Sequence, residues 1–234
     1  YQCDWSSDVC SSDLREWYNE NSLMEGGIYP NTLEYAYNTV IPMNQAAMKM
    51  CDILGFVDLS GSIRANEQFV KQFGEKPNFF GHDDILIMDP VAMLNKLQDQ
   101  LPWTSALKNK RVLVISTHEQ SIRYQWNNID KVWGKNRDII APFELVDVIR
   151  SPYHPIMDDR QYPDCNTWAE SVNYIMQEIQ KKDFDVLLTS STTSSPIYAE
   201  VAKQMGKVGI QTGGVLQLWF GIVGYRWAPE ANNG

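Results

Sequence analysis

The sequence predicts an α/β protein whose core is an open, mostly parallel β-sheet with helices on both faces. Two observations carry this prediction. In the C-terminal half, four short apolar runs alternate with segments whose apolar residues recur every three or four positions. Polar loops marked by glycine, proline and serine separate the runs from the helical segments. Such strand–helix alternation is typical of βαβ units.

The four expected strands are runs rich in β-branched and aliphatic residues. They are 111–116 (RVLVIS), 143–149 (FELVDVI), 184–190 (FDVLLTS) and 207–211 (KVGIQ). Nearly continuous apolar runs of this length are typical of parallel strands that are buried on both faces. Open α/β sheets bind ligands beyond the carboxyl ends of their strands, so the loops after these runs are where we look for a site.

Two of the expected helices are recognised by apolar stripes. The first stripe consists of Ile122, Trp126, Ile129 and Trp133, spaced four, three and four residues apart. The second consists of Trp168, Val172, Ile175, Met176 and Ile179. Thr167 and Glu170 stand at the start of this second stripe with the spacing of a capping box.

A third helix is expected after the third strand. Ser195 is a suitable cap and Pro196 suits the first helical turn. Gly206 stands just after the apolar positions of this helix, and glycine commonly ends a helix at such a place. A last apolar helix is expected after Gly213 and Gly214.

The N-terminal half is less regular. Asn31 and Glu34 form a capping pair before a helix that runs towards Met50, with an interruption expected near Pro42. Short strands are expected within 51–59 (CDILGFVDL) and 83–89 (DDILIMD), and a helix within 64–73.

Residues 1–14 stand apart from the rest of the chain. The stretch 4–14 (DWSSDVCSSDL) has neither helical nor strand periodicity, and it matches the translation of a sequencing-library adapter at every letter. We therefore expect residues 1–14 to be an artefact outside the fold. Two other interpretations are a secreted leader in which Cys3 and Cys10 pair, and a cation loop. The aspartates of the stretch, however, lack calcium-loop spacing.

Composition limits the function classes. Without residues 1–14, 220 residues remain, and the loss of three aspartates moves the formal net charge from -9 to -6. This acidic balance argues against nucleic-acid binding and against a polybasic membrane surface. Cys51 and Cys165 are the cysteines that remain, which predicts a reducing, cytoplasmic setting without a disulfide framework. The apolar run GVLQLWFGIV has ten residues, so no transmembrane segment is expected.

The strongest candidate site combines two loops that follow adjacent strands. The loop after the third strand carries six hydroxyl side chains before a helix: Ser190, Ser191, Thr192, Thr193, Ser194 and Ser195. Free N–H groups and the positive end of a helix favour a phosphate there, although a plain polar loop is the competing interpretation. The next loop holds Gln211, Gly213 and Gly214, whose glycines permit either close approach to a ligand or a tight turn.

Three further side chains are candidates for the same site. His118 follows the first strand and is suited to act as a base or a phosphate contact. Arg226 is a candidate phosphate clamp, and Trp227 is placed to stack on a base or sugar. Asp183 and Asp185 have the Asp-x-Asp pattern of metal-dependent sugar transferases. We interpret them as a helix-to-strand turn, because they lie at the start of a strand.

Several segments resemble a bacterial family of GT-D-fold, glycosyltransferase-like proteins, many of them described as hypothetical. The resemblance covers about 15–227 and is strongest in 102–227, through PWTSALKNKRVLVIS, FELVDVI and DFDVLLTSSTTSSPIYAEVAKQMGKVGIQTGGVLQLWFGIVGYRW. GGIYPNT and CDILGF resemble earlier family segments. The resemblance implies one Rossmann-like domain over 15–234, with an irregular part at 15–101, a βαβ core at 102–227 and a tail at 228–234.

The resemblance also implies chemistry. Its relatives use nucleotide-sugar donors with a divalent metal, here expected to be Mg or Mn, and the partner would be a glycan or glycoconjugate acceptor. The family's Arg-x-Gly-Asp-Gly-Glu-like motif is not present here. In the family, this motif lies before the segment that GGIYP resembles. We therefore expect the chain to lack the segment that carries the motif, together with the N-terminal strand. Without them we expect little activity. The family's glycine-rich loop is replaced here by SSTTSS, and Tyr225 replaces the lysine of a Gly-Lys-Arg-Trp motif that otherwise matches Gly224, Arg226 and Trp227.

Three functions remain open from the sequence. The first is a cytoplasmic glycosyltransferase of polysaccharide or glycoconjugate synthesis, in which Arg226 stabilises charge on the leaving diphosphate. The second is a non-catalytic nucleotide- or sugar-phosphate-binding module. The third is a structural partner domain. An Asp-Gly-Glu motif upstream of Arg15 would favour the enzyme, and its absence would favour the binding module.

Overall fold

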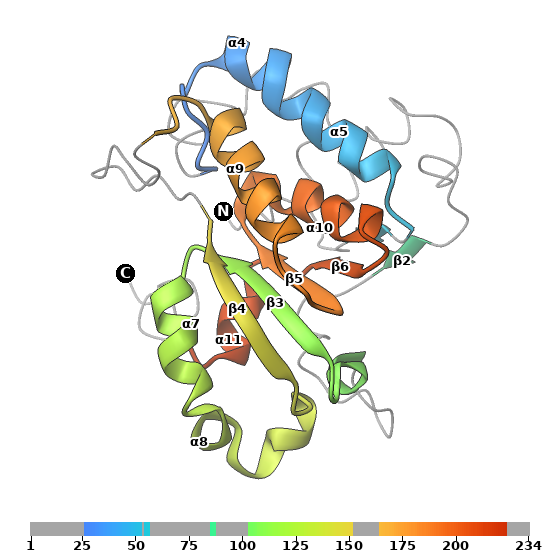
Figure 1. Cartoon of the computed structure of the whole chain (residues 1–234), viewed down its shortest axis with the longest axis vertical. Coiled ribbons are helices and arrows are strands. Elements are labelled where there is room, and N and C mark those ends of the chain that lie inside the picture. The colour runs from blue at the N-terminus through green and yellow to red at the C-terminus, as the bar shows by residue number, and fades with distance from the viewer. Residues whose placement is uncertain (1–25, 53, 57–84, 88–102, 152–163, 224–234) are drawn as a thin grey trace.

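The computed structural model describes residues 26–52, 54–56, 85–87, 103–151 and 164–223 (Figure 1). A four-stranded parallel sheet lies between two layers of helices, so the predicted α/β class is confirmed and a Rossmann-like arrangement is compatible with it. Residues 1–14 and the helix expected within 64–73 lie outside the described residues. Within the described part of the chain, no helix is long and apolar enough to cross a membrane.

The main sheet has the strand order β4-β3-β5-β6, and each neighbouring pair is parallel. Its strands are β3 (Arg111–Ser116), β4 (Glu144–Arg150), β5 (Val186–Ser190) and β6 (Val208–Gln211). The prediction for β3 is confirmed residue by residue, whereas the other three strands begin one or two residues later than predicted. Phe143 and Phe184 account for two of these differences, because both are buried side chains that enter the core from the preceding loops.

Helices α5 (Ile41–Lys49), α9 (Trp168–Gln180) and α10 (Ser195–Gln204) cover one face of the sheet (Figure 1). On β3, Leu113 and Ile115 pack into this layer, and Val112 and Val114 pack into the opposite layer. Strict alternation of buried side chains on both faces explains why β3 is an almost continuous apolar run in the sequence.

Helices α7 (Glu119–Trp126), α8 (Ile129–Trp133) and α11 (Val215–Trp219) cover the other face. The single helical stretch predicted through Ile122 and Trp133 is wrong in one respect, because it is divided into α7 and α8 at Asn127 and Asn128. Both asparagine amides donate to carbonyls four residues earlier, at 3.3 and 3.2 Å. Asparagine side chains that bind the local backbone in this way compete with helix continuation.

The start of α9 confirms the predicted cap. The Oγ1 atom of Thr167 accepts a hydrogen bond from the N–H of Glu170 at 3.3 Å. The Glu170 carboxylate accepts from the N–H of Asn166 at 2.6 Å, so the return bond reaches one residue further than a capping box predicts. Two apolar positions of the stripe, Val172 and Ile175, are fully buried.

The first described helical segment begins one residue later than predicted. Thr32, and not Asn31, is the cap, since its Oγ1 accepts from the N–H of Tyr35 at 3.2 Å. The helix is not interrupted at Pro42, because a wide π-helical turn precedes this residue, which has no N–H to donate. The segment consists of α4 (Leu33–Tyr35), the π turn Ala36–Val40 and α5.

Helix α10 and strand β6 pack closely. Ser195 is the first residue of α10 and not its cap, a correction to the sequence prediction, because its Oγ is held by the N–H of Ser191 at 2.7 Å. Gly206 follows the helix as predicted. A Cβ atom at Gly209 of β6 would lie 2.2 Å from the backbone oxygen of Ala199 in α10, so this close approach requires glycine.

A second, two-stranded parallel sheet is formed by β1 (Leu54–Phe56) and β2 (Ile85–Ile87). Both strands lie inside the segments where short strands were expected, within 51–59 and 83–89. Parallel pairing requires a crossover connection between the two strands, which distinguishes this pair from a hairpin.

Candidate functional site

The loops that carry the predicted site residues follow three neighbouring strands. His118 follows β3, residues 190–195 begin at the last residue of β5, and residues 211–214 begin at the last residue of β6. Because β3, β5 and β6 are adjacent and parallel, these loops lie at one edge of the sheet, which we call the carboxyl edge. The structure therefore brings together three segments that are distant in the sequence.

The strand order places a topological switch point between β3 and β5. After β3 the chain enters α7 on one face, and after β5 it enters α10 on the other. Ser116 and Ser190 are register partners at this point, and Ser190 donates a hydrogen bond to the Ser116 Oγ at 3.1 Å. Ser116 is fully buried, whereas Ser190 is half-buried. In open α/β sheets, ligands bind in the crevice at such a switch point.

Most hydroxyls of the loop at 190–195 stabilise the loop itself. Ser191, Thr193, Ser194 and Ser195 are buried. Thr193 donates to the Gly26 carbonyl at 2.9 Å, and Ser194 donates to the Ser191 carbonyl at 3.0 Å. Thr192 begins the 3₁₀ turn Thr192–Ser194 that leads into α10. Of the hydroxyls whose burial is described, Ser190 is therefore the one best placed to meet a ligand.

The sequence prediction missed two threonines that connect β5 to β6. The N–H and the Oγ1 of Thr212 both donate to the Thr189 carbonyl, at 2.9 and 3.0 Å. Thr189 Oγ1 in turn bonds the Ser195 Oγ at 3.2 Å. Thr189 is the penultimate residue of β5, and Thr212 directly follows β6. Threonines near the carboxyl ends of apolar strands are the sequence signal that would have indicated this role.

The loop after β6 is a tight turn that begins α11. Gly213 has a positive φ of 59°, which a residue with a side chain rarely adopts. Gly214 precedes the first helical residue of α11, and both glycines, like Gln211, are half-buried. The turn therefore presents backbone and one amide side chain beside the switch point.

His118 lies on the exposed surface just before α7. Its N–H donates to the Ser116 Oγ at 3.2 Å, which connects it to the serine pair. Its imidazole makes no capping hydrogen bond to the first turn of α7, so the helix start does not hold the ring in place. Arg226 and Trp227 lie outside the described residues, and their roles stay predictions.

The Asp-x-Asp pattern lies at the opposite edge of the sheet, before β5. Arg111 forms ion pairs with both Asp183 and Asp185, the latter at 2.9 Å. Hydrogen bonds from the guanidinium and the backbone N–H of Arg111 lower the pKa of Asp185 from 3.8 to about 2. These carboxylates connect two strand starts, which agrees with the interpretation as a turn.

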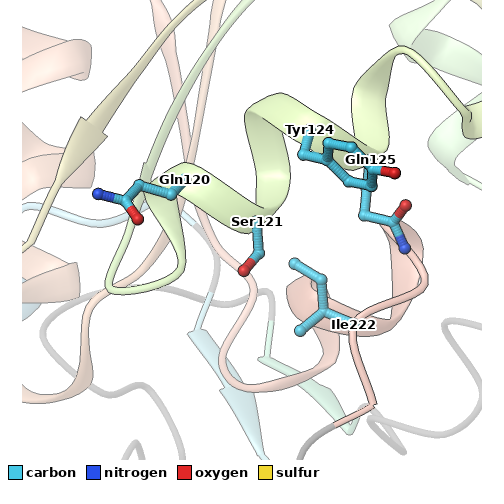
Figure 2. Close-up of a pocket in the computed structure, with 5 residues that line it drawn as sticks. All are labelled: Gln120, Ser121, Tyr124, Gln125 and Ile222. Atoms are coloured by element: carbon cyan, nitrogen blue, oxygen red, sulfur yellow. The ribbon is translucent and has the colours of Figure 1, made fainter.

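A pocket of about 410 Å³ lies on the outer side of α7 (Figure 2). It is open to solvent, and sequence reasoning did not anticipate it because its residues belong to segments about one hundred positions apart. Its lining residues are Gln120, Ser121, Tyr124, Gln125 and Ile222.

Comparison with models of protein families, with curated proteins and with solved structures returned no match. The resemblance to GT-D-fold proteins therefore stays a prediction.

Proposed function

We propose that the carboxyl edge binds the diphosphate of a nucleotide sugar and that the protein transfers the sugar to a glycan or glycoconjugate acceptor. The observation that carries this proposal is the Ser116–Ser190 pair at the switch point between β3 and β5. The half-buried Ser190 hydroxyl, the start of α10 and the Gly213–Gly214 turn all border this point. Helix starts and backbone N–H groups are suited to phosphate oxygens.

The other roles follow from the chemistry of the residues. His118 is the candidate base, since imidazole is the side chain most often used as a general base. Arg226 would stabilise the negative charge that develops on the leaving diphosphate, and Trp227 would stack on the base or sugar.

The divalent metal implied by the family does not fit these loops on their own. Mg²⁺ and Mn²⁺ prefer carboxylate oxygens, and residues 116–118, 190–195 and 211–214 contain no carboxylate. The residues that the structure describes also include no group of three or more His, Cys, Asp or Glu side chains arranged to hold a metal. No step of the proposed reaction is therefore assigned to a metal.

A second candidate function is a binding module without turnover. Among residues 116–118, 190–195 and 211–214, His118 is the single residue of a type commonly used as a general acid or base. A single exposed imidazole provides few groups for acid–base catalysis. This observation favours a module that binds its ligand without catalysing a reaction.

The test is calorimetric titration of the protein with nucleoside diphosphates and nucleoside diphosphate sugars, with and without Mg²⁺. Ser190→Ala and Arg226→Ala should each weaken binding, the latter by about 1.5–3 kcal/mol, because each removes a donor to an anionic ligand. Asp183→Asn, at the opposite edge, is the matched control and should leave affinity unchanged. Release of free sugar or glycosylated acceptor would distinguish the transferase from the binding module.

Two results would contradict the proposal. One is the absence of binding by every nucleotide in the panel. The other is metal-dependent binding that Asp183→Asn abolishes and Ser190→Ala and Arg226→Ala leave intact, because this would place the site at the Asp-x-Asp edge.

A further inference from the structure

The pocket beside α7 is lined by uncharged side chains. Two glutamines and one serine supply hydrogen-bond donors and acceptors, Tyr124 supplies an aromatic ring, and Ile222 supplies an aliphatic wall. Figure 2 shows Ser121 and Gln125 on the side of α7 that faces Ile222. Its volume of about 410 Å³ is open to solvent, so a ligand would contact the pocket on one side only.

The charged residues of α7 are turned away from this pocket. Glu119 and Arg123 pair with each other one helical turn apart, and Arg123 also binds Asp147 of β4 at 2.6 Å. The pocket residues of α7 occupy a separate sector of roughly 140° at 100° per residue. The pocket therefore offers hydrogen bonding and stacking without a full charge.

Tyr124 is available to a ligand. Its side chain is 71% exposed, the largest exposed fraction among the large hydrophobic residues that the structure describes as exposed. The amide nitrogen of Gln125 lies 3.5 Å from the Gly221 carbonyl oxygen, at the long limit of a hydrogen bond. Its carboxamide supplies one donor group and one acceptor at the pocket wall.

We propose that this pocket binds a neutral sugar unit of a glycan. A pyranose has an apolar C–H face that suits the ring of Tyr124, and its hydroxyls are matched by the amide and hydroxyl groups of Gln120, Ser121 and Gln125. A nucleotide phosphate or a charged peptide would find no counter-charge among the lining residues.

The position of the pocket suits it to hold the acceptor of the proposed transfer reaction. Gln120 and Ser121 lie in the first turn of α7, two and three residues after His118, so the pocket adjoins the carboxyl end of β3. The acceptor role rests on the proposed transferase function, whereas sugar binding itself does not.

Saturation-transfer NMR tests the proposal with neutral sugars at millimolar concentration and without nucleotide. The probes are glucose, galactose, N-acetylglucosamine, maltose, cellobiose and lactose, with glucuronic acid as the charged comparison. We expect at least one neutral sugar to bind and Tyr124→Ala to weaken its binding by roughly fivefold to tenfold, as loss of aromatic contact implies. Tyr124→Phe should retain most of the affinity, because it keeps the ring.

Tyr174→Ala is the matched control. Tyr174 is a 45% exposed tyrosine of α9, which packs on the other face of the sheet, and its loss should leave sugar binding unchanged. Nucleotide binding by Tyr124→Ala should equal that of the unaltered protein, which separates this proposal from the function of the carboxyl edge.

Three results would overturn the proposal. The first is that no neutral sugar binds. The second is that a sugar binds but Tyr124→Ala does not weaken its binding. The third is that Tyr124→Ala changes the oligomeric state of the protein and not its sugar binding. The last result would show that the pocket is a protein contact and not a sugar site.

Discussion

Arg111 holds the carboxylate of Asp185 in its ionised form. This carboxylate accepts the backbone N–H of Arg111 at 2.9 Å and the Nη2 of the same residue at 2.9 Å. These bonds lower its pKa from 3.8 to about 2, although the side chain is 35% exposed. One carboxylate thus joins the starts of β3 and β5 through both the backbone and the side chain of Arg111.

This ionisation predicts a sign for the pH dependence of stability. A carboxyl group whose pKa is lowered on folding stabilises the protein above its unfolded pKa of 3.8, and this contribution is lost as the pH falls through the folded value of about 2. Asp185→Asn should therefore be less stable than the unaltered protein at pH 7, and the difference should shrink between pH 4 and pH 2. Urea denaturation at a series of pH values measures this.

Asp183→Asn provides the comparison for this experiment. Its side chain is 76% exposed, so solvent screens its pair with Arg111 and the variant should have the smaller effect at pH 7. An Asp185→Asn variant with the same pH profile as the unaltered protein would contradict the assignment.

At the scale of elements, strand β4 shows why an aspartate stands in the middle of the run FELVDVI. The register with β3 shifts between Leu145 and Asp147, so Val146 has no partner. Leu145 and Val148 then pack on one face and Val146 and Ile149 on the other. Asp147 belongs to neither apolar cluster, and β4 is the outermost strand of the sheet among the described residues.

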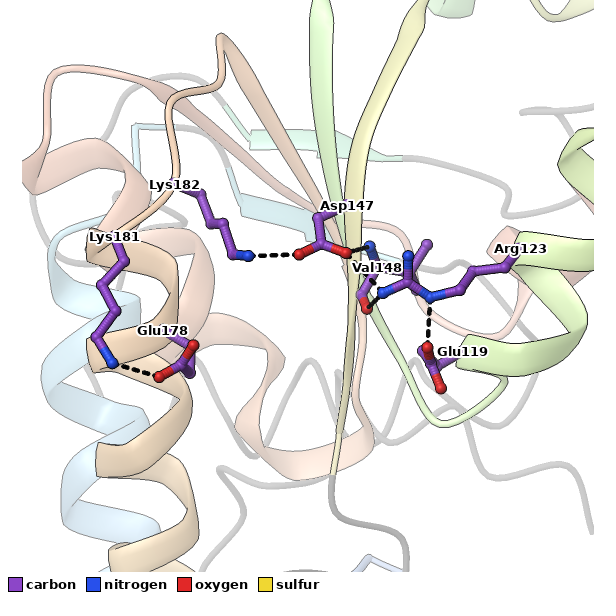
Figure 3. A network of polar contacts seen from close by, with 7 residues as sticks. All are labelled: Glu119, Arg123, Asp147, Val148, Glu178, Lys181 and Lys182. Atoms are coloured by element: carbon purple, nitrogen blue, oxygen red, sulfur yellow. Dashed lines mark hydrogen bonds and ion pairs between the residues drawn. The ribbon is translucent and has the colours of Figure 1, made fainter.

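Asp147 protects this edge of the sheet (Figure 3). Its carboxylate accepts from the N–H of Val148 at 2.8 Å and from Lys182 at 2.5 Å, and Arg123 donates to the Val148 carbonyl at 2.6 Å. Both backbone polar groups of Val148 are thereby engaged, which opposes edge-to-edge pairing with another strand. Burial disfavours the charge of Asp147, but the bonds from Lys182 and Arg123 outweigh it and lower its pKa.

Asp147→Asn should therefore destabilise the protein by on the order of 1–3 kcal/mol, because it weakens three bonds to a charged acceptor. Glu178→Gln is the matched control: Glu178 has a similar exposed fraction of 24%, against 22% for Asp147, but within the described residues its ion pair is with Lys181 only. Its loss should cost about 1 kcal/mol or less. Chemical denaturation measures both, and equal costs would show that the Asp147 network has no special role.

At the scale of the whole molecule, one sheet supports two separate hydrophobic layers. Leu113 and Leu187 are register partners in the layer with α9 and α10, and Leu188 lies in the layer with α7 and α11. All three side chains are fully buried. The backbone of β3 and β5 separates the two layers.

This arrangement predicts which truncations are coupled. Leu113→Val and Leu187→Val should each cost about 1 kcal/mol, and their double variant should depart from the sum by more than about 0.5 kcal/mol, because they share one packed layer. Leu113→Val with Leu188→Val should be additive within about 0.5 kcal/mol. Equilibrium unfolding of the single and double variants measures this, and coupling across the sheet that equals coupling within a layer would contradict it.

Elements whose signals are local can be identified from the sequence. The run at 111–116, the cap at Thr167 and the glycine after α10 depend on neighbouring residues, so periodicity and side-chain chemistry identify them. Where two local signals compete, the predicted cap is one residue away from the observed one. Asn31 and Thr32 are both good caps, and only the structure shows that Thr32 binds the helix.

The tertiary structure alone decided which distant residues meet. Ser116 and Ser190 are 74 positions apart, and no spacing in the sequence states that β3 and β5 are neighbours or that their register pairs these two serines. The same strand order places the hydroxyls of Ser191, Thr193, Ser194 and Ser195 in the interior, Asp147 at the strand edge and the pocket beside α7. Strand order follows from the packing of helices on both faces of the sheet, a property of the whole chain that no local pattern encodes.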